Sequence, residues 1–373
     1  EESLEEGGEE EVPPPLERMQ QVSDTIKVLE ASGNLEALVR TWVEFGACVR
    51  MQHGDTHPLL VRTHFNLATT YLRQKLIPQA LSHFKAADGV NSQLETKDAD
   101  AQSFHCRILE GLGICETRLG HYAAAQSLLD KAKRLCMPPP PEGAGADELE
   151  QEEEVVHSGA AASVLVALSE LHSAQGKYEE AIDCLTQAWM SKESELGPQH
   201  VQVGKLFSAM ATIKQKHLRD LQQQLSDVEM TLHSSVRVKQ QIDEKTEGLH
   251  LQGEQEEQGV AQLVRDIAHY RSRQQSLEHE VRECKGDALD YMNRARKIIT
   301  AARGGGHPDS VALTKTVSAL AARFAEEEKE AIRAKKLEEE KAHAKMSPTK
   351  KAAQEATTEW LKKQVCVCVR VCV

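Results

Sequence analysis

Few residues of this sequence have the types and the spacing that chemistry requires. His53 and His57 lie four residues apart, a spacing used by metal ligands, but they flank Gly54 and lack cysteine partners at metal-binding spacing. The Gly304–Gly306 run resembles part of a phosphate-binding loop, yet no Lys-Ser or Lys-Thr pair follows it directly, and no strand is expected before it. The motifs of P-loop, dinucleotide-binding, zinc-protease and serine-hydrolase enzymes do not occur in the sequence. We therefore expect no enzyme, and no catalytic, cofactor-binding or metal-binding residues.

One short motif is typical of a regulatory site. Ser347 precedes Pro348, and Lys350 follows two residues after the proline, which is the pattern of a proline-directed kinase site. A phosphate on Ser347 would add about −1.5 to −2 charge beside a lysine-rich segment. The motif therefore predicts a phosphorylation site that releases or docks this segment.

The cysteines indicate packing rather than reactivity. They form no Cys-x-x-Cys pair, and six of the nine lie within helical patterns. We expect these six to be small buried apolar residues in a reducing compartment. They are Cys48, Cys106, Cys115, Cys136, Cys184 and Cys284. The other three lie in Val365–Val373, where valine and cysteine alternate as a repeated GT dinucleotide would encode them. We interpret that end as an artefact of gene prediction and assign it no function.

Composition and charge exclude several classes of protein. Aromatic residues make up 4% of the 373 residues, which is few for the pleated faces of a β-sandwich or barrel. Alanine, leucine and valine supply most of the apolar content, which favours helices. A net charge of −13 argues against a nucleic-acid binder with a basic patch. No run of 18 or more uncharged apolar residues occurs, so we expect no membrane insertion.

A constellation of small and large apolar residues occurs three times, in residues 61–89, 106–133 and 162–191. In each copy an alanine follows a leucine by 13 residues, and a phenylalanine or leucine follows that alanine by 4. Small residues at fixed positions let two antiparallel helices approach closely, so each copy predicts a helical hairpin. The residues assigned to this packing are Leu67, Ala68, Tyr71, Ala80, Phe84, Ala87, Leu112, Gly113, Ala125, Leu129, Ala132, Leu168, Ala181, Leu185 and Ala188.

These copies resemble the tetratricopeptide repeat family, whose unit has a Leu-Gly or Leu-Ala pair, a Gly-x-Tyr turn and an Ala-x-x-x-Phe/Leu-x-x-Ala helix. The turns here are Gly120–Tyr122 and Gly176–Tyr178. The resemblance implies an all-α superhelix of helical hairpins that binds other proteins. Linkers such as Gly54–Pro58 and Gly197–His200 resemble those of kinesin-light-chain-type repeats. Residues 24–215 resemble the tetratricopeptide repeat protein 23 and 23-like subfamily, which implies an adaptor at the cilium in Hedgehog signalling.

Weaker units are expected around the three clear ones. Before them, residues 28–32 and a turn at Gly33 lead to a second helix that carries Leu38, Trp42 and Phe45. After them, a further first helix is predicted over residues 201–216. Another unit would pair residues 288–302 with residues 311–323.

The first helix of each unit is expected to line the concave face of the superhelix, where side chains not needed for packing contact an extended peptide. The residues assigned to this peptide groove are His64, Asn66, Thr70, Arg107, Glu110, Ile114, Leu165, Glu170 and Ser173. Glu110, Glu116 and Glu170 put acids where a clamp for a carboxylate needs bases. We therefore expect no carboxylate clamp of the kind that grips a chaperone terminus.

Residues 217–291 carry apolar heptads, which are clear at 218–232 and 260–291 and poor at 235–256. Their unbroken phase favours one continuous coiled-coil helix of about 74 residues that dimerises. Gly253 and the weak centre favour an antiparallel helical hairpin instead. The continuous helix is the preferred alternative.

The predicted fold class is all-α, a tetratricopeptide-type superhelix of helical hairpins followed by a long coiled-coil helix or an antiparallel hairpin. The predicted order is a disordered acidic lead (1–17), a degenerate and two clear repeats (18–137), a disordered Pro/Glu loop (138–157), a third clear repeat with a further helix (158–216), a coiled coil (217–291), terminal repeat helices (292–324), a charged single helix (325–345) and a disordered tail (346–373).

The leading hypothesis for function is a non-catalytic scaffold whose repeats bind a partner peptide or helix. The resemblances add a ciliary adaptor in Hedgehog signalling and, as an alternative, a cytoskeletal or motor-cargo adaptor. A second alternative is a co-chaperone-like repeat protein without a carboxylate clamp. We expect protein partners, self-association through residues 218–291, no nucleic acid, and a cytoplasmic location at the cilium or cytoskeleton.

Overall fold

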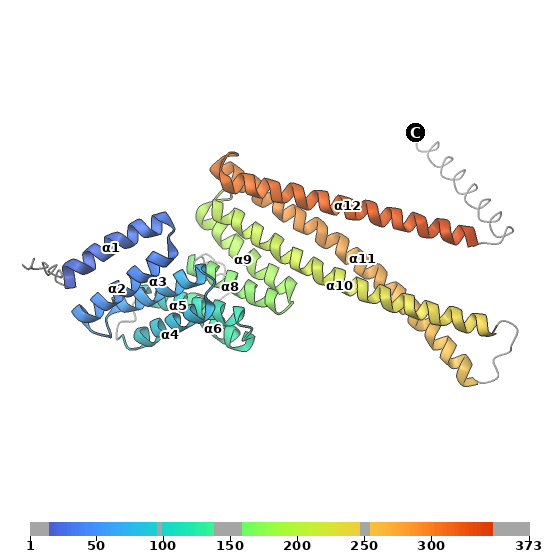
Figure 1. Cartoon of the computed structure of the whole chain (residues 1–373), viewed down its shortest axis with the longest axis horizontal. Helices are drawn as coiled ribbons and strands as arrows, with labels where there is room; N and C mark the ends of the chain where they lie inside the picture. The colour runs from blue at the N-terminus through green and yellow to red at the C-terminus, as the bar shows by residue number, and fades with distance from the viewer. Residues whose placement is uncertain (1–14, 95–98, 138–158, 247–253, 346–373) are drawn as a thin grey trace, which may run out of the picture. The chain divides into compact units, whose positions relative to one another are not determined.

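The computed structural model describes residues 15–94, 99–137, 159–246 and 254–345, and over these residues it contains helices and no strand (Figure 1). The all-α class predicted from the sequence is confirmed. The helices are α1 (Pro15–Ser32), α2 (Leu35–His53), α3 (Pro58–Arg73), α4 (Ile77–Ser92), α5 (Ala99–Arg118), α6 (Tyr122–Cys136), α8 (Gly159–Ala174), α9 (Tyr178–Leu196), α10 (Val201–Thr246), α11 (Glu254–Arg303) and α12 (Pro308–Lys345).

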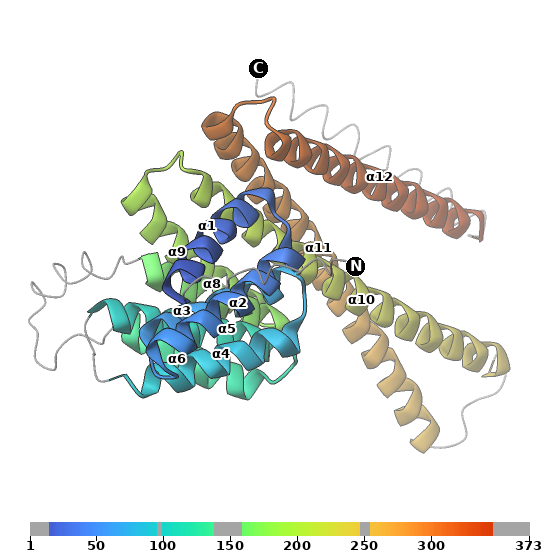
Figure 2. The same ribbon diagram turned by 60° about the vertical axis from the view of Figure 1, so that its left-hand side comes forward.

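The first eight helices pack as hairpins of consecutive helices, α1 with α2, α3 with α4, α5 with α6 and α8 with α9. Neighbouring hairpins also touch, because α2 contacts α3, α4 contacts α5, and α5 and α6 both contact α8. The result is a stack of helical hairpins, as the repeated constellation predicts (Figures 1 and 2).

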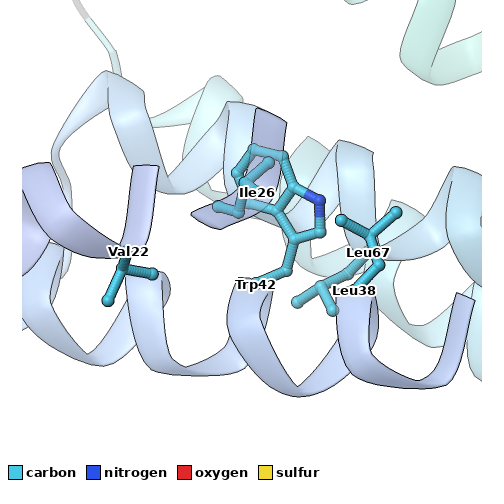
Figure 3. Packing of buried hydrophobic residues seen from close by; sticks show 5 residues of the cluster. All are labelled: Val22, Ile26, Leu38, Trp42 and Leu67. Atoms are coloured by element: carbon cyan, nitrogen blue, oxygen red, sulfur yellow. The ribbon is translucent and has the colours of Figure 1, made fainter. Parts of the chain in front are cut away.

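The residues assigned to repeat packing are buried, except for Tyr71, which is half-buried. Close approach explains the small ones: a Cβ atom on Gly113 would lie 2.6 Å from the side chain of Leu129 on the partner helix. The degenerate first unit is also present, since Val22 and Ile26 of α1 pack with Leu38 and Trp42 of α2 and with Leu67 of α3 (Figure 3). The first two hairpins therefore share one apolar cluster.

The turn inside each clear repeat uses the same backbone conformation. Gly120 and Gly176 have positive φ values of 83° and 78°. Each lies eight residues after the leucine that begins the spacing pattern of its repeat, Leu112 or Leu168. Lys75 holds that position in the first clear repeat and adopts φ 63° without being a glycine. A side chain in this left-handed region is strained, so Lys75 is a site of local cost.

After the repeats, α10 and α11 form an antiparallel hairpin (Figures 1 and 2). The contacts show the direction, because residues further along α10 meet residues earlier in α11. A Cβ atom on Gly204 would lie 2.7 Å from Ile299, whereas further along Lys214 Nζ lies 3.2 Å from Asp287. Still further along, Gln274 Nε2 donates to Glu229 over 3.4 Å.

This hairpin corrects the preference for one continuous helix through residues 217–291. Helix α10 ends at Thr246 and α11 begins at Glu254. Heptad residues such as Leu218 and Leu277 are buried within one chain. The poor heptads at 235–256 and Gly253 predict the hairpin correctly. The unbroken heptad phase does not exclude it, since a turn of suitable length preserves that phase. No second copy is needed to bury these leucines.

The last part of α11 packs on the first part of α10, as the contact of Ile299 with Gly204 shows. These two segments form a hairpin at the end of the stack, and their remaining lengths extend from it as an arm, residues 221–246 and 254–281. The pairing of residues 288–302 with residues 311–323 stays a prediction.

The chain divides into two compact units, residues 1–310 and 311–373. Within the second unit, α12 is one uninterrupted helix to Lys345, with ion pairs such as Arg323–Glu327 between successive turns. The charged helix predicted over 325–345 is its later part. The predicted disordered lead, loop and tail, and the predicted phosphorylation site at Ser347, fall largely or wholly on residues 1–14, 138–158 and 346–373, outside the described residues. Residues 15–17, predicted as the end of the disordered lead, instead begin α1.

The cysteines agree with the sequence only in part. Cys48, Cys115 and Cys284 are buried free thiols, and Cys184 is half-buried. Cys106 of α5 and Cys136 of α6, however, form a disulfide. The expectation that all six helical cysteines are reduced is wrong for this pair, because the hairpin brings two residues 30 positions apart into contact.

Candidate functional site

The residues assigned to the peptide groove divide by exposure. Thr70, Leu165 and Ser173 are buried and offer no surface to a peptide. Thr70 instead donates a hydrogen bond to the carbonyl of Asn66, and Ser173 Oγ lies 3.3 Å from Lys216 Nζ of α10. The remaining assigned residues are exposed or half-buried: His64, Asn66, Arg107, Glu110, Ile114 and Glu170.

Arg107 is the cation of this surface. Its guanidinium carbon lies 4.7 Å from the ring centre of Phe65 on α3 and 5.6 Å from that of Phe104 on α5. The two rings are themselves 5.0 Å apart, so they form one aromatic platform across the α3–α5 seam. Stacking holds the planar guanidinium in place while leaving its edge donors free for a carboxylate or phosphate.

Acidic side chains follow at the next seam. Glu110 of α5 accepts a hydrogen bond of 2.7 Å from Ser163 of α8, and Glu170 of α8 lies 3.6 Å from Arg118. Burial raises the pKa of the Glu110 carboxyl, although the Ser163 hydrogen bond and the charge of Arg107 oppose this. The stacking of Arg107 joins α3 to α5, and the polar contacts of Glu110 and Glu170 join α5 to α8. These three side chains, with Phe65 and Phe104, therefore lie on one surface, which we call the first-helix face.

His64 does not belong to the first-helix face. Its Nδ1 lies 3.1 Å from Nδ1 of His83 on α4, and its Nε2 lies 3.2 Å from a guanidinium nitrogen of Arg50 on α2. Burial, together with the charges of His83 and Arg50, lowers the pKa of His64 to about 4. Sequence position placed His64 in the groove, but the helix turns it toward the neighbouring second helices.

A cavity of about 120 Å³ opens beside these histidines, between α2, α3 and α4. Its walls are apolar at Trp42, Val43, Leu60 and Leu67, and polar at Arg50, His64 and His83. We call it the Arg50 pocket. The sequence offered no signal for it, because its residues come from three helices and only the hairpin packing brings them together.

A charged cluster joins the arm to the last repeat. Lys214 of α10 lies 3.1 Å from Glu179 of α9 and 3.2 Å from Asp287 of α11. Burial pushes the pKa of Lys214 down, but the hydrogen bonds and charges of Glu179 and Asp287 outweigh it and raise the pKa. Close by, the rings of Tyr178 and His217 stack with centres 4.7 Å apart. We call Glu179, Lys214 and Asp287 the root cluster, because they lie at the base, or root, of the arm; no sequence pattern predicts it.

The histidines of the linkers have a structural use. The Nδ1 atoms of His57, His200 and His307 each accept a hydrogen bond of 3.2 Å from a backbone N–H two residues on. Each histidine thereby caps the start of the helix that follows, satisfying a donor that would otherwise be free. His53 stacks on His57 with ring centres 4.3 Å apart.

Among the described residues, no three His, Cys, Asp or Glu side chains gather closely enough to hold a metal ion. A search of the same residues also finds no helix that is long and apolar enough to cross a membrane.

No protein-family model and no curated protein matches the sequence. Among solved structures, the chain is similar to a Podosopora anserina putative kinesin light chain with nearly identical TPR-like repeats, at 12% identity over 71% of this chain and 99% of that one, with a TM-score of 0.39. It is similar to BtubC (BKLC) from P. vanneervenii, at 14% identity over 80% and 95%, with a TM-score of 0.34.

A third similar structure is a Rap protein complexed with Competence and Sporulation Factor, at 11% identity over 85% of this chain and 78% of that one, with a TM-score of 0.42. All three TM-scores lie below 0.5, so the likeness carries no argument about function. The narrower resemblance to the tetratricopeptide repeat protein 23 subfamily has no sequence match behind it.

Proposed function

We propose that this chain is a non-catalytic interaction protein whose first-helix face binds an extended segment of a partner protein, with an acidic side chain of the partner on Arg107. The observation that carries the proposal is the exposed guanidinium of Arg107, stacked on Phe65 and Phe104. Over the described parts of the chain Arg107 has no ion pair.

A stacked arginine suits this role for two reasons. Its side chain is already ordered by the rings, so less rotamer entropy is lost on binding. Its fork of donors matches a carboxylate in two parallel hydrogen bonds, which a lysine does not do. An acid on the partner therefore gains both affinity and orientation at the α3–α5 seam.

The neighbouring seam selects a different side chain. Glu110 is half-buried and its carboxyl already accepts from Ser163, so it repels a second acid and favours a donor such as a hydroxyl or amide. The first-helix face thus favours a partner segment with an acidic side chain at Arg107, followed by a hydrogen-bond donor at Glu110. We assign the half-buried Asn66 of α3 and Ile114 of α5 to the same face, as a polar and an apolar contact.

The experiment is a peptide-array screen with the full chain, comparing wild type with Arg107→Glu. Arg40→Glu, an equal change on an exposed residue of α2, is the matched control. Wild type and the control are expected to enrich peptides with acidic residues, and Arg107→Glu is expected to lose at least about tenfold in their affinity. Equal peptide preferences for Arg107→Glu and wild type would overturn the proposal.

The identity of the partner is a separate question. The resemblances of the sequence support a ciliary adaptor in Hedgehog signalling, a cytoskeletal or motor-cargo adaptor, or a co-chaperone-like protein without a clamp. Proximity labelling in ciliated cells, with Arg107→Glu as the paired bait, tests these together. Loss of ciliary partners on substitution supports the first, loss of microtubule or motor proteins the second, and loss of chaperones the third.

A further inference from the structure

The Arg50 pocket differs from the first-helix face in both place and chemistry. It lies between α2, α3 and α4, and its apolar walls include Val43, which is 53% exposed at the surface. Its volume of about 120 Å³ is enough for one aliphatic side chain. The pocket is therefore a candidate site for a single anchoring residue rather than for an extended chain.

The polar wall of the pocket has a fixed order of donors and acceptors. Arginine can only donate, so His64 Nε2 must accept from Arg50 and His64 carries its proton on Nδ1. That proton is then donated to Nδ1 of His83, whose own proton must lie on Nε2. The ring of Tyr71 stacks on that of His83, with ring centres 5.4 Å apart and an angle of 9° between the ring planes, and holds it in this orientation.

This order leaves one positive charge at the pocket. Burial lowers the pKa values of His64 and His83, so both rings are neutral at neutral pH and Arg50 is the cation. No carboxylate lines the cavity. In the described structure the ion-pair partner of Arg50 is Asp55 at 3.5 Å, whose side chain is 86% exposed, so this pair is weak and replaceable. The chemistry that fits is an aliphatic side chain next to a carboxylate.

The segment that precedes α1 has this chemistry. Residues 1–14 contain seven glutamates, and Leu4 is followed directly by Glu5 and Glu6. The segment also ends in the right place, because it leads into α1 and an ion pair of Arg18 with Glu44 ties the beginning of α1 to α2. Glu44 lies six residues before Arg50 on that helix, a distance of about 9 Å along its axis.

The length of the segment is sufficient. Eleven residue steps separate Leu4 from Pro15, and an extended chain covers roughly 36 Å in eleven steps. That reach is about four times the 9 Å that separates Glu44 from Arg50 along the axis of α2. We propose that the Arg50 pocket binds the acidic segment of residues 1–14 of the same chain, with Leu4 in the cavity and a neighbouring glutamate on Arg50.

The test uses the full chain with isotope-labelled histidine, because His64 and His83 line the site and report on its occupant by NMR. Leu4→Asp is expected to shift the ring signals of both histidines. Val12→Asp, which adds the same charge to the same segment, is the matched control and is expected to leave them unchanged. Both positions lie outside the described residues, so neither substitution changes a residue of the described core.

A second measurement is the rate at which a glutamate-specific protease cleaves within residues 1–14. Arg50→Glu and Leu4→Asp are each expected to raise the rate about tenfold, as the loss of a charge-assisted contact and of its anchor would do. Val12→Asp and Arg107→Glu are expected to cleave as wild type does. The last variant separates this proposal from that for the first-helix face.

Unchanged histidine signals and an unchanged cleavage rate in Leu4→Asp would overturn the proposal. Equal effects of Leu4→Asp and Val12→Asp would overturn it too, because they would show a general effect of charge without an anchor. A partner peptide that shifts the histidines of wild type and Leu4→Asp alike would assign the pocket to another protein.

Discussion

The repeats and the arm are built from the same kind of helix but bury it to different degrees. In the repeats, Ala80, Ala125 and Ala181 are fully buried, because each helix touches its hairpin partner and a neighbouring hairpin. In the arm α10 and α11 pack on each other, and a cavity of about 360 Å³ lies beside Val264 and Ile267. Val264 remains 44% exposed. Leu277 of the arm is fully buried all the same, so a single partner helix closes the apolar stripe at some positions and leaves it open at others.

The largest effect that tests this comparison comes from removing one leucine from the repeats. Leu129→Ala is expected to lower the free energy of unfolding by about 3 kcal/mol, since Leu129 is fully buried against Gly113. Ile267→Ala in the arm is expected to cost less than half as much, because its site already borders a cavity. Urea unfolding measures both, and equal losses would contradict the comparison.

A second test adds a side chain instead of removing one. Gly204→Leu is expected to destabilise the chain by about 2 kcal/mol, because its Cβ would lie 2.7 Å from Ile299 and force the root of the arm apart. Gly259→Leu in α11 meets nothing within 4 Å and is expected to be neutral or slightly stabilising. Thermal unfolding followed by helicity distinguishes them, and a matching loss in Gly259→Leu would show a tightly packed arm.

The charges of the root and of the arm give a third comparison. Lys214→Met is expected to cost about 1 kcal/mol, since Lys214 is buried and bridges Glu179 and Asp287. Lys239→Met, which removes the exposed pair with Asp243, is expected to cost less than about 0.5 kcal/mol. Because the pKa of Lys214 is raised, its contribution is present below pH 10.5 and is lost as the pH rises through the higher folded value.

Hydrogen exchange of α10 gives the matching readout for the root. Faster exchange near Lys214 in Lys214→Met, with the repeats unchanged, is the expected result. Exchange that stays as in wild type would show that the root is held by apolar packing alone.

Acid is expected to weaken the repeats through His64. The pKa of His64 is lowered from 6.5 to about 4, so the folded chain disfavours its charged form and stability falls as the pH drops from about 6.5 toward 4. Arg50 and His83 face the ring and oppose its protonation. The melting temperature of His64→Gln, measured across this window, is expected to fall less than that of wild type. Parallel curves would show that other groups cause the loss.

The smallest effect concerns the turn of the first clear repeat. Lys75→Gly is expected to stabilise the chain by up to about 1 kcal/mol, because glycine adopts the positive φ of this position without strain. Gly120→Lys, the reverse change at the equivalent turn, is expected to destabilise by a similar amount. A loss of stability in Lys75→Gly would mean that the entropy of the unfolded glycine outweighs the relieved strain.

The sequence predicts the hairpins well because their signal is local. The offset from Leu112 to Ala125 lies within one hairpin, so it survives in the sequence as a fixed spacing. The residues of the peptide groove are harder to predict. The position of Arg107 in the first helix of its repeat assigns it to the groove, but Phe65 and Phe104, which orient it, come from two different units and show no fixed spacing. The direction in which a side chain leaves its helix is harder still to predict, since a small rotation of α3 decides whether His64 faces the groove or Arg50.

The prediction of one continuous helix through the arm was wrong for a related reason. A heptad pattern reports which face of a helix is apolar and says nothing about whether its partner is another chain or the same chain after a turn. The root cluster joins Glu179, Lys214 and Asp287 across more than 100 residues, so no local pattern could reveal it.

The contact of Gly204 with Ile299 closes a loop of 95 residues, whereas His64 and His83 meet across 19. Closing the longer loop costs about 1.4 kcal/mol more in chain entropy if its ends must find each other unaided. Pairing α10 with α11 turn by turn avoids most of this cost, because each added contact shortens the loop that remains open. The arm thus gives the last hairpin of the stack a way to form quickly.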